Sequence, residues 1–230
     1  MNNENIKNFL ENVQTKTISL YRYSIKRAFG IYYSTWAIAL FYFIFFSPLL
    51  IAYLPNNIEG DLLDDLGFTA VILAATYFTF KAFSRSSRSK ELESIFHMKY
   101  KNRLGIFFRW FNIVFMAVLF GYLFIAIYLV NVLPVFVFYV VFYLFLLFIS
   151  FVLLFSLKVS LGRIPFEGYL ASLTYMFSSL SSIFLFLLIH PTIFPIASIQ
   201  IIWAPTVISW VIAGMYTFYT APGELGFYEP

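Results

Sequence analysis

Charged residues are scarce in this chain, and cysteine is absent. Only 11% of the 230 residues are Asp, Glu, Lys or Arg, against about 25% in an average soluble domain. The absence of cysteine excludes disulfide bonds, thiolate catalysis, Cys-ligated zinc and Cys-ligated iron–sulfur clusters. The first 28 residues also lack the apolar region of a cleavable signal peptide. We therefore expect the first apolar span to act as an uncleaved signal anchor.

Apolar and aromatic residues dominate the composition instead. Hydrophobic residues make up 61% of the chain, which contains 31 Phe and 17 Tyr. A water-soluble fold of this size has too much surface for its volume to hide so many apolar side chains. The composition predicts a single all-α membrane domain, residues 1–230, with a bilayer as its solvent.

Six segments are long and apolar enough to cross a bilayer. A helix rises about 1.5 Å per residue and a bilayer core is about 30 Å thick, so one span needs roughly 20 residues. The predicted spans are approximately 31–54, 66–83, 104–130, 135–157, 169–189 and 199–219. The second is the shortest and least apolar. Asn131 and Pro134 predict a tight turn between the third and fourth spans.

The Lys and Arg residues sort into alternate loops. Segment 1–30 carries five, the stretch 81–109 carries eight and the loop after the fourth span carries two, whereas the other loops carry none. Lys and Arg are retained on the cytoplasmic side of membrane proteins, so both termini are expected in the cytoplasm. The residues expected to set this topology include Arg85, Arg88, Lys99, Lys101 and Arg103. The positive charge then reflects orientation and attraction to anionic lipids, not nucleic-acid binding.

The loop after the first predicted span has the opposite charge. Its ionisable residues are Glu59, Asp61, Asp64 and Asp65. We expect a solvated acidic loop on the outer side of the membrane.

Residues 4–28 carry apolar side chains at helical spacing. The stripe consists of Ile6, Phe9, Leu10, Val13, Thr17, Leu20, Tyr21 and Ser24. It predicts an amphipathic helix that lies in the membrane interface before the chain turns into the first span. The alternative is a helix packed on the protein's own cytoplasmic face.

A second amphipathic helix is predicted from Lys90 onward, inside the basic loop. One side of it carries Leu92, Ile95, Phe96 and Tyr100. Acidic residues near its start and basic residues near its end complement the helix dipole. Such a helix can dock into a groove on a soluble partner, or it can lie on lipid. These four residues are therefore the candidates for partner docking.

The spans hold small residues but no central charges. No Asp, Glu, Lys or Arg falls near the middle of a span, which counts against an ion-coupled carrier. Pro48 and Pro205 are expected to kink the first and sixth spans. The pairs that allow close helix packing are Ala70 and Ala74, Ser178 and Ser182, and Ser209 and Ala213. The serines fit either ordinary helix packing or a hydroxyl-lined substrate path.

The sequence predicts neither an active site nor a cofactor or metal site. It shows no Ser-His-Asp order, no paired intramembrane carboxylates and no Gly-rich phosphate loop. The two histidines, His97 and His190, are expected on opposite sides of the bilayer and could not ligate one haem. A membrane enzyme acting on lipids is accordingly the least favoured function.

Four features define the layout of the predicted domain. They are an amphipathic helix at 5–26, six spans with cytoplasmic ends, an amphipathic cytoplasmic segment at 90–101 and an apolar outer loop at 191–198. This layout resembles the membrane subunit of the six-helix ABC-2 type exporters. The resemblance implies a permease that dimerises and is driven by a separately encoded cytosolic ATPase, with Leu92, Ile95 and Phe96 at the ATPase contact.

Two functions thus remain open for a multi-pass protein of the cell membrane. The first is a transport subunit driven by a cytosolic ATPase, as the resemblance implies. The second is a non-catalytic accessory or assembly subunit, since aromatic and nearly uncharged spans suit packing against other membrane subunits. Membrane lipids are partners under both.

Overall fold

The computed structural model describes residues 3–49, 58–87, 135–188 and 196–226. Within these ranges the chain is helical and contains no strand, which confirms the all-α prediction. The elements are α1 (Asn3–Phe41), the π-helix η1 (Tyr42–Phe46), α3 (Ile58–Ser87), α6 (Val135–Leu161), α7 (Phe166–Leu188), α8 (Ile196–Thr220) and the 3-10 helix η3 (Ala221–Leu225). The predicted third span, 104–130, and the turn after it lie outside the described residues.

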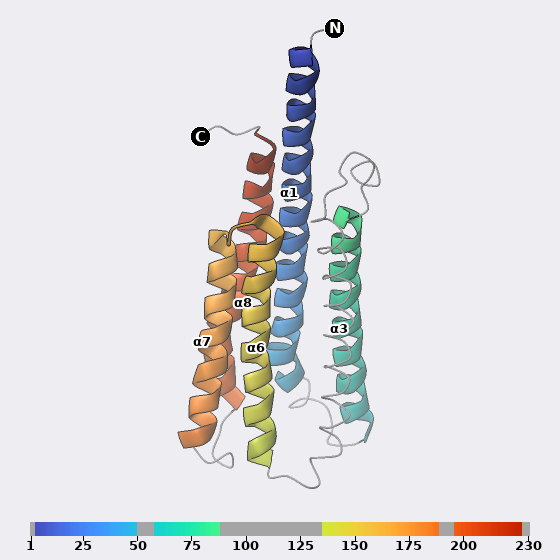
Figure 1. Cartoon of the computed structure of the whole chain (residues 1–230). Coiled ribbons are helices and arrows are strands. Elements are labelled where there is room, and N and C mark those ends of the chain that lie inside the picture. The colour runs from blue at the N-terminus through green and yellow to red at the C-terminus, as the bar shows by residue number, and fades with distance from the viewer. Residues whose placement is uncertain (1–2, 50–57, 88–134, 189–195, 227–230) are drawn as a thin grey trace.

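The helices lie side by side as a bundle (Figure 1). Helix α1 contacts α3 and α8, α8 contacts α7, and α7 contacts α6. Helix α1 begins and η3 ends at the same end of the bundle, where α1 projects beyond the other helices. The predicted spans 135–157, 169–189 and 199–219 lie within a few residues of α6, α7 and α8.

Helix α1 is one continuous helix, so the predicted turn between an interfacial helix and the first span is wrong. Its 39 residues give a length of about 58 Å, nearly twice the thickness of a bilayer core. Ile25 and Phe29 are buried in the same hydrophobic core as Tyr33, which holds the two halves in line. Gly30 lies inside this helix, and its missing side chain lets the Phe218 ring of α8 approach to 3.3 Å of the Cβ position.

A π-helix lies just before Pro48, where the sequence predicts a kink. Residue 48 would donate to the Ile44 carbonyl in an α-helix, but proline has no N–H. The chain widens into η1 just before this proline, and Gln200 Nε2 on α8 donates to the Ile44 carbonyl at 3.0 Å. Prolines and π-bulges are both features at which helices bend. Around Pro205, by contrast, α8 continues as a single helix.

Helix α3 begins eight residues before the predicted second span. The acidic residues from Glu59 to Asp65 are therefore helical and do not form the predicted loop. Carboxylates near a helix N-terminus interact favourably with the helix dipole, which explains why an acidic stretch extends this helix.

Aromatic rings connect the helices across the core. Neighbouring centroids lie 5.0 to 6.3 Å apart along one chain of contacts, within the range of favourable aromatic pairs. The rings belong, in order, to Phe83, Phe29, Tyr33, Trp210, Tyr175, Trp203 and Tyr143. This chain of contacts runs from α3 through α1, α8 and α7 to α6, so aromatic rings link all five long helices that the structure describes.

Two described helices are long and apolar enough to cross a membrane by length and composition. They are Glu11–Leu49 and Gln200–Leu225, and Leu146–Lys158 is a shorter apolar helix. The core helices of soluble proteins can meet the same criterion.

Candidate functional site

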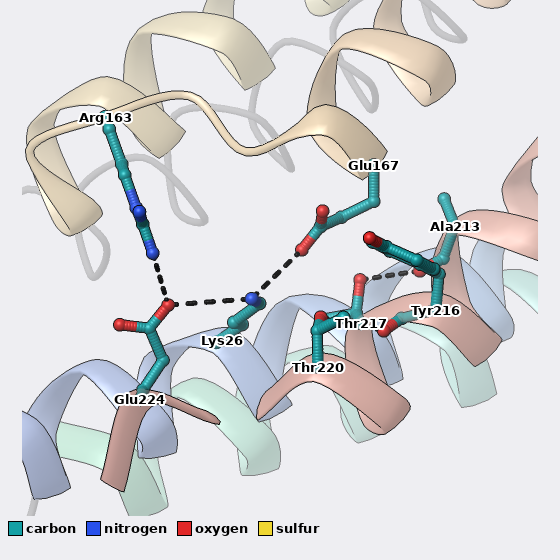
Figure 2. Close-up of polar contacts among 8 residues, drawn as sticks. All are labelled: Lys26, Arg163, Glu167, Ala213, Tyr216, Thr217, Thr220 and Glu224. Atoms are coloured by element: carbon teal, nitrogen blue, oxygen red, sulfur yellow. Dashed lines mark hydrogen bonds and ion pairs between the residues drawn. The ribbon is translucent and has the colours of Figure 1, made fainter. Parts of the chain in front are cut away.

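Four charged side chains from separate elements meet at the end of the bundle where α1 projects (Figure 2). Lys26 Nζ on α1 lies 3.6 Å from Glu167 Oε1 on α7 and 3.5 Å from Glu224 Oε1 on η3. Arg163, between α6 and α7, donates from Nη2 to Glu224 Oε1 at 2.8 Å. We call these four residues the ion cluster. It ties the first helix to the last helical segment and to the α6–α7 turn.

The cluster is buried except at Arg163. The side chain of Lys26 is 9% exposed, that of Glu167 3% and that of Glu224 11%, whereas that of Arg163 is 70% exposed. Two cations face two carboxylates, so the formal charge of the cluster is zero. Moving an ion out of water costs several kcal/mol even in real proteins, and mutual pairing offsets that cost here. Removal of one member would leave a buried charge unpaired.

Local sequence places Arg163 and Glu167 at this end. Helix α6 ends at Leu161, and Gly162, with φ of 73°, donates to the Lys158 carbonyl at 3.0 Å. This left-handed conformation is the usual role of glycine after a helix. Pro165 immediately precedes α7, and its carbonyl accepts from Gly168 N at 3.0 Å. Glu167 lies in the first turn of α7, where a carboxylate also complements the helix dipole.

A second polar region lies between α7 and α8 in the interior of the bundle. Ser178 donates to the Ile202 carbonyl at 2.8 Å and lies 2.7 Å from the Thr206 hydroxyl. Trp203 Nε1 donates to Ser182 Oγ at 3.0 Å. The contact between the Thr174 and Ser209 hydroxyls and the bond from Trp210 Nε1 to the Ala171 carbonyl continue this row of hydrogen bonds along the two helices. We call the row the ladder. These groups are buried and satisfy one another, as helix-packing hydroxyls do in a low-dielectric interior.

The predicted small residues divide into two groups. Ser178, Ser182, Ser209 and Ala213 are buried, and the three serines take part in the ladder, which favours helix packing over a substrate path at this interface. Ala70 and Ala74 are exposed on α3, where the buried alanines are Ala75 and Ala82. The structure therefore does not bring the pair on α3 into the core.

Most predicted docking and topology residues lie outside the described ranges. These are Leu92, Ile95, Phe96 and Tyr100 for docking, and Arg88, Lys99, Lys101 and Arg103 for topology. Arg85 is described; it is exposed in the last turn of α3. The docking assignment thus stays a prediction.

The ion cluster was missed from the sequence. Its members are separated by up to 198 positions, from Lys26 to Glu224, and each reads as an isolated boundary charge. Glu167 and Glu224 each lie a few residues outside a predicted span, 169–189 and 199–219 respectively. A buried carboxylate needs a cationic partner, but the sequence shows neither that these two are buried nor which cation they meet.

Comparisons with protein families, with curated proteins and with solved structures find no match to this chain. In the described part of the chain, no three His, Asp or Glu side chains gather where they could hold a metal ion. The chemistry of the described site is therefore that of paired charges and hydrogen bonds between helices.

Proposed function

We propose that this chain is a six-span membrane protein whose cation-rich end faces the cytoplasm. The described cations support this orientation because they gather at one end of the bundle. Arg27 lies on α1 beside the ion cluster, Arg85 and Lys158 are in the last turns of α3 and α6, and Arg163 is between α6 and α7. The acidic start of α3 is at the opposite end (Figure 1). This is the distribution that the cytoplasmic retention of Lys and Arg produces.

The exposed surface of the bundle supports a hydrocarbon environment. Large apolar side chains point outward along three neighbouring helices. They include Phe148, Phe151 and Phe155 on α6, Leu173, Phe177 and Phe184 on α7, and Ile201, Ile208 and Met215 on α8. Soluble proteins rarely expose contiguous apolar surface on this scale, whereas lipid tails would cover it at no cost.

The direction of the helices supports the predicted third span. Helix α3 ends at the cation-rich end, and α6 begins at the opposite end (Figure 1). A crossing by residues 104–130 fits between them and gives six spans in total. Both termini then fall on the cytoplasmic side, as the sequence predicts.

Within this frame, the proposed activity is that of a transport subunit driven by a cytosolic ATPase. The continuity of α1 carries this proposal. The helix projects from the cytoplasmic end and reaches the bundle core without a break, and Lys26 holds it to α7 and η3 on the way. A rigid helix with such contacts can transmit a partner's movement to the spans, provided the bundle has a second arrangement. The chain would bind the ATPase and would not itself hydrolyse ATP.

The structure changes the basis of the exporter resemblance. An N-terminal helix lying in the interface is absent from the described residues, because α1 is straight through residues 28–31. The resemblance now depends on the number of spans and on the predicted segment 90–101. The proposal therefore depends on docking of the ATPase at Leu92, Ile95 and Phe96, which the next experiment tests.

Co-purification tests the partner directly. The tagged chain is extracted in mild detergent from its native membrane and the bound cytosolic proteins are identified by mass spectrometry. An ATPase should be recovered with the wild type and lost with Leu92→Asp/Phe96→Asp. The matched control is Tyr219→Asp, an exposed aromatic residue in the last turn of α8, which should retain it. Absence of an ATPase from the wild-type preparation contradicts the transport proposal.

A second candidate function is a non-catalytic subunit of a larger membrane complex. The observation that favours it is the ladder between α7 and α8, where the hydroxyls bond one another and backbone carbonyls. No hydroxyl of that ladder is left over for a passing substrate. This alternative predicts stoichiometric recovery with other integral membrane proteins and no ATPase.

A further inference from the structure

Three buried polar atoms at the inner edge of the ion cluster have no hydrogen-bond partner within the described part of the chain. They are the Tyr33 hydroxyl, Glu167 Oε1 and the Ser172 hydroxyl. Tyr33 and Ser172 have no exposed surface, and Glu167 is 2% exposed. Native proteins leave few such groups unsatisfied, so three in one region need a physical explanation.

The three groups converge on the first turns of α7. The Tyr33 hydroxyl lies 3.5 Å from the Cβ position of Gly168, the residue after Glu167. Glu167 precedes Gly168 in the chain and lies in the same first turn of α7. Ser172 lies one helical turn beyond Gly168, so it is on the same face of α7.

The ion pairs of Lys26 point to the same place. Its distances of 3.6 Å to Glu167 and 3.5 Å to Glu224 exceed the 2.7–3.2 Å of a direct hydrogen bond from an N–H donor. An ammonium group carries three N–H donors, and the described residues supply no direct hydrogen bond to those of Lys26. The N–H donors of Lys26 are therefore available to a further acceptor that lies beside these ion pairs.

We propose that the ion cluster contains a buried hydration site in which water bridges Tyr33, Glu167 and Lys26. Water suits the site chemically because it can accept from the phenol and the ammonium while it donates to the carboxylate. Buried waters make about three such bonds to groups that would otherwise be unsatisfied. The cluster is already neutral, so its charges favour neither a bound cation nor a bound anion. The ligand class is therefore a small neutral hydrogen-bonding molecule, and this conclusion is independent of any transport role.

Pulsed X-ray radiolysis with mass spectrometry tests this proposal on the intact protein in detergent. Radiolysis converts bound water into hydroxyl radicals that modify the side chains beside it, including side chains that bulk solvent does not reach. Tyr33 should be modified. Trp203 is the matched control: it is 3% exposed, chemically more reactive, and its N–H is satisfied by Ser182, so it should stay protected. Protection of Tyr33 to the same degree as Trp203 overturns the proposal.

The substitution Tyr33→Phe gives an independent test, because the direction of the change in Tm depends on whether water bonds the hydroxyl. If water bonds the phenol, loss of the hydroxyl removes one of the water's partners, and the Tm should fall. If the hydroxyl is a buried group without any partner, its removal relieves a desolvation cost and the Tm should rise. Tyr21→Phe, at a half-buried position nearer the projecting end of α1, controls for loss of a tyrosine hydroxyl. A rise in Tm for Tyr33→Phe contradicts the hydration site.

Discussion

Gln200 on α8 donates a hydrogen bond to the Ile44 carbonyl on η1, with an N–O distance of 3.0 Å. The two residues are 156 positions apart, and the bond satisfies a carbonyl whose α-helical donor is absent because residue 48 is proline. A glutamine in the last span thus compensates for a proline in the first. This pairing fixes the ends of the two helices that lie away from the ion cluster.

Replacement of Gln200 by leucine should destabilise the protein by about 1 kcal/mol, since a buried carbonyl loses its donor. The cost should shrink in a Pro48→Ala background, where residue 48 regains an N–H that can bond Ile44. A double-mutant cycle measured by thermal unfolding in detergent gives the coupling. Equal costs of Gln200→Leu in both backgrounds would show that the two residues act independently.

Loss of Lys26 should be among the most damaging single changes. Lys26→Met leaves Glu167 without its cation in a buried site, and breaking a buried pair in this way costs about 3–5 kcal/mol. Lys158→Met is the matched control: Lys158 is exposed, so its loss should change stability by less than about 0.5 kcal/mol. Unfolding in a denaturing detergent series compares the two.

The same experiment separates pairing from simple loss of charge. The double variant Lys26→Met/Glu167→Gln removes both charges of one pair and should be more stable than the sum of the single changes predicts. Additive costs would contradict the pairing. Arg163→Met should cost below about 1 kcal/mol, because its side chain is 70% exposed and exposed ion pairs contribute little.

The ladder between α7 and α8 predicts different effects for adjacent serines. Ser182→Ala leaves the buried Trp203 indole N–H without its acceptor and should cost about 1 kcal/mol. Ser181 is the adjacent control, only half-buried, and Ser181→Ala should be nearly neutral. Similar thermal unfolding of the two variants would contradict a stabilising role for this bond.

Small residues on α8 and α3 should respond differently to enlargement. Ala213 has no exposed surface, and Ala213→Leu should cost about 1–3 kcal/mol through overpacking. Ala74 is exposed, and Ala74→Leu should be tolerated by the isolated protein. If Ala74→Leu instead disrupts recovery with another membrane protein, the pair Ala70 and Ala74 packs against a partner.

Patterns local in sequence predicted much of the fold. Runs of apolar residues identified α6, α7 and α8 to within a few residues, because burial in hydrocarbon or in a core requires such runs. The sorting of Lys and Arg into alternate loops predicted that cations gather at one end of the bundle. The continuous α1 was missed because apolar spacing shows a helix but not whether it bends. The contacts that hold α1 in the core, among them those of Ile25, Phe29 and Gly30, come from helices distant in sequence.

Long-range pairings could not be predicted from the sequence. The bond from Gln200 to Ile44 and the ion cluster depend on which helices are neighbours and on their relative heights. A single glutamine or glutamate at a span boundary reads as a residue in contact with water. Pro48 did mark a carbonyl in need of a donor, but nothing in the sequence identified Gln200 as that donor.

Accessibility of single cysteines on intact cells tests most directly whether the bundle crosses a membrane with its cation-rich end inside. The chain contains no cysteine, so each introduced thiol is unique. Glu59→Cys, at the start of α3, should react with a membrane-impermeant maleimide added outside, and Lys158→Cys, at the end of α6, should react only after permeabilisation. Labelling of both thiols, or of neither, on intact cells would contradict the proposed arrangement.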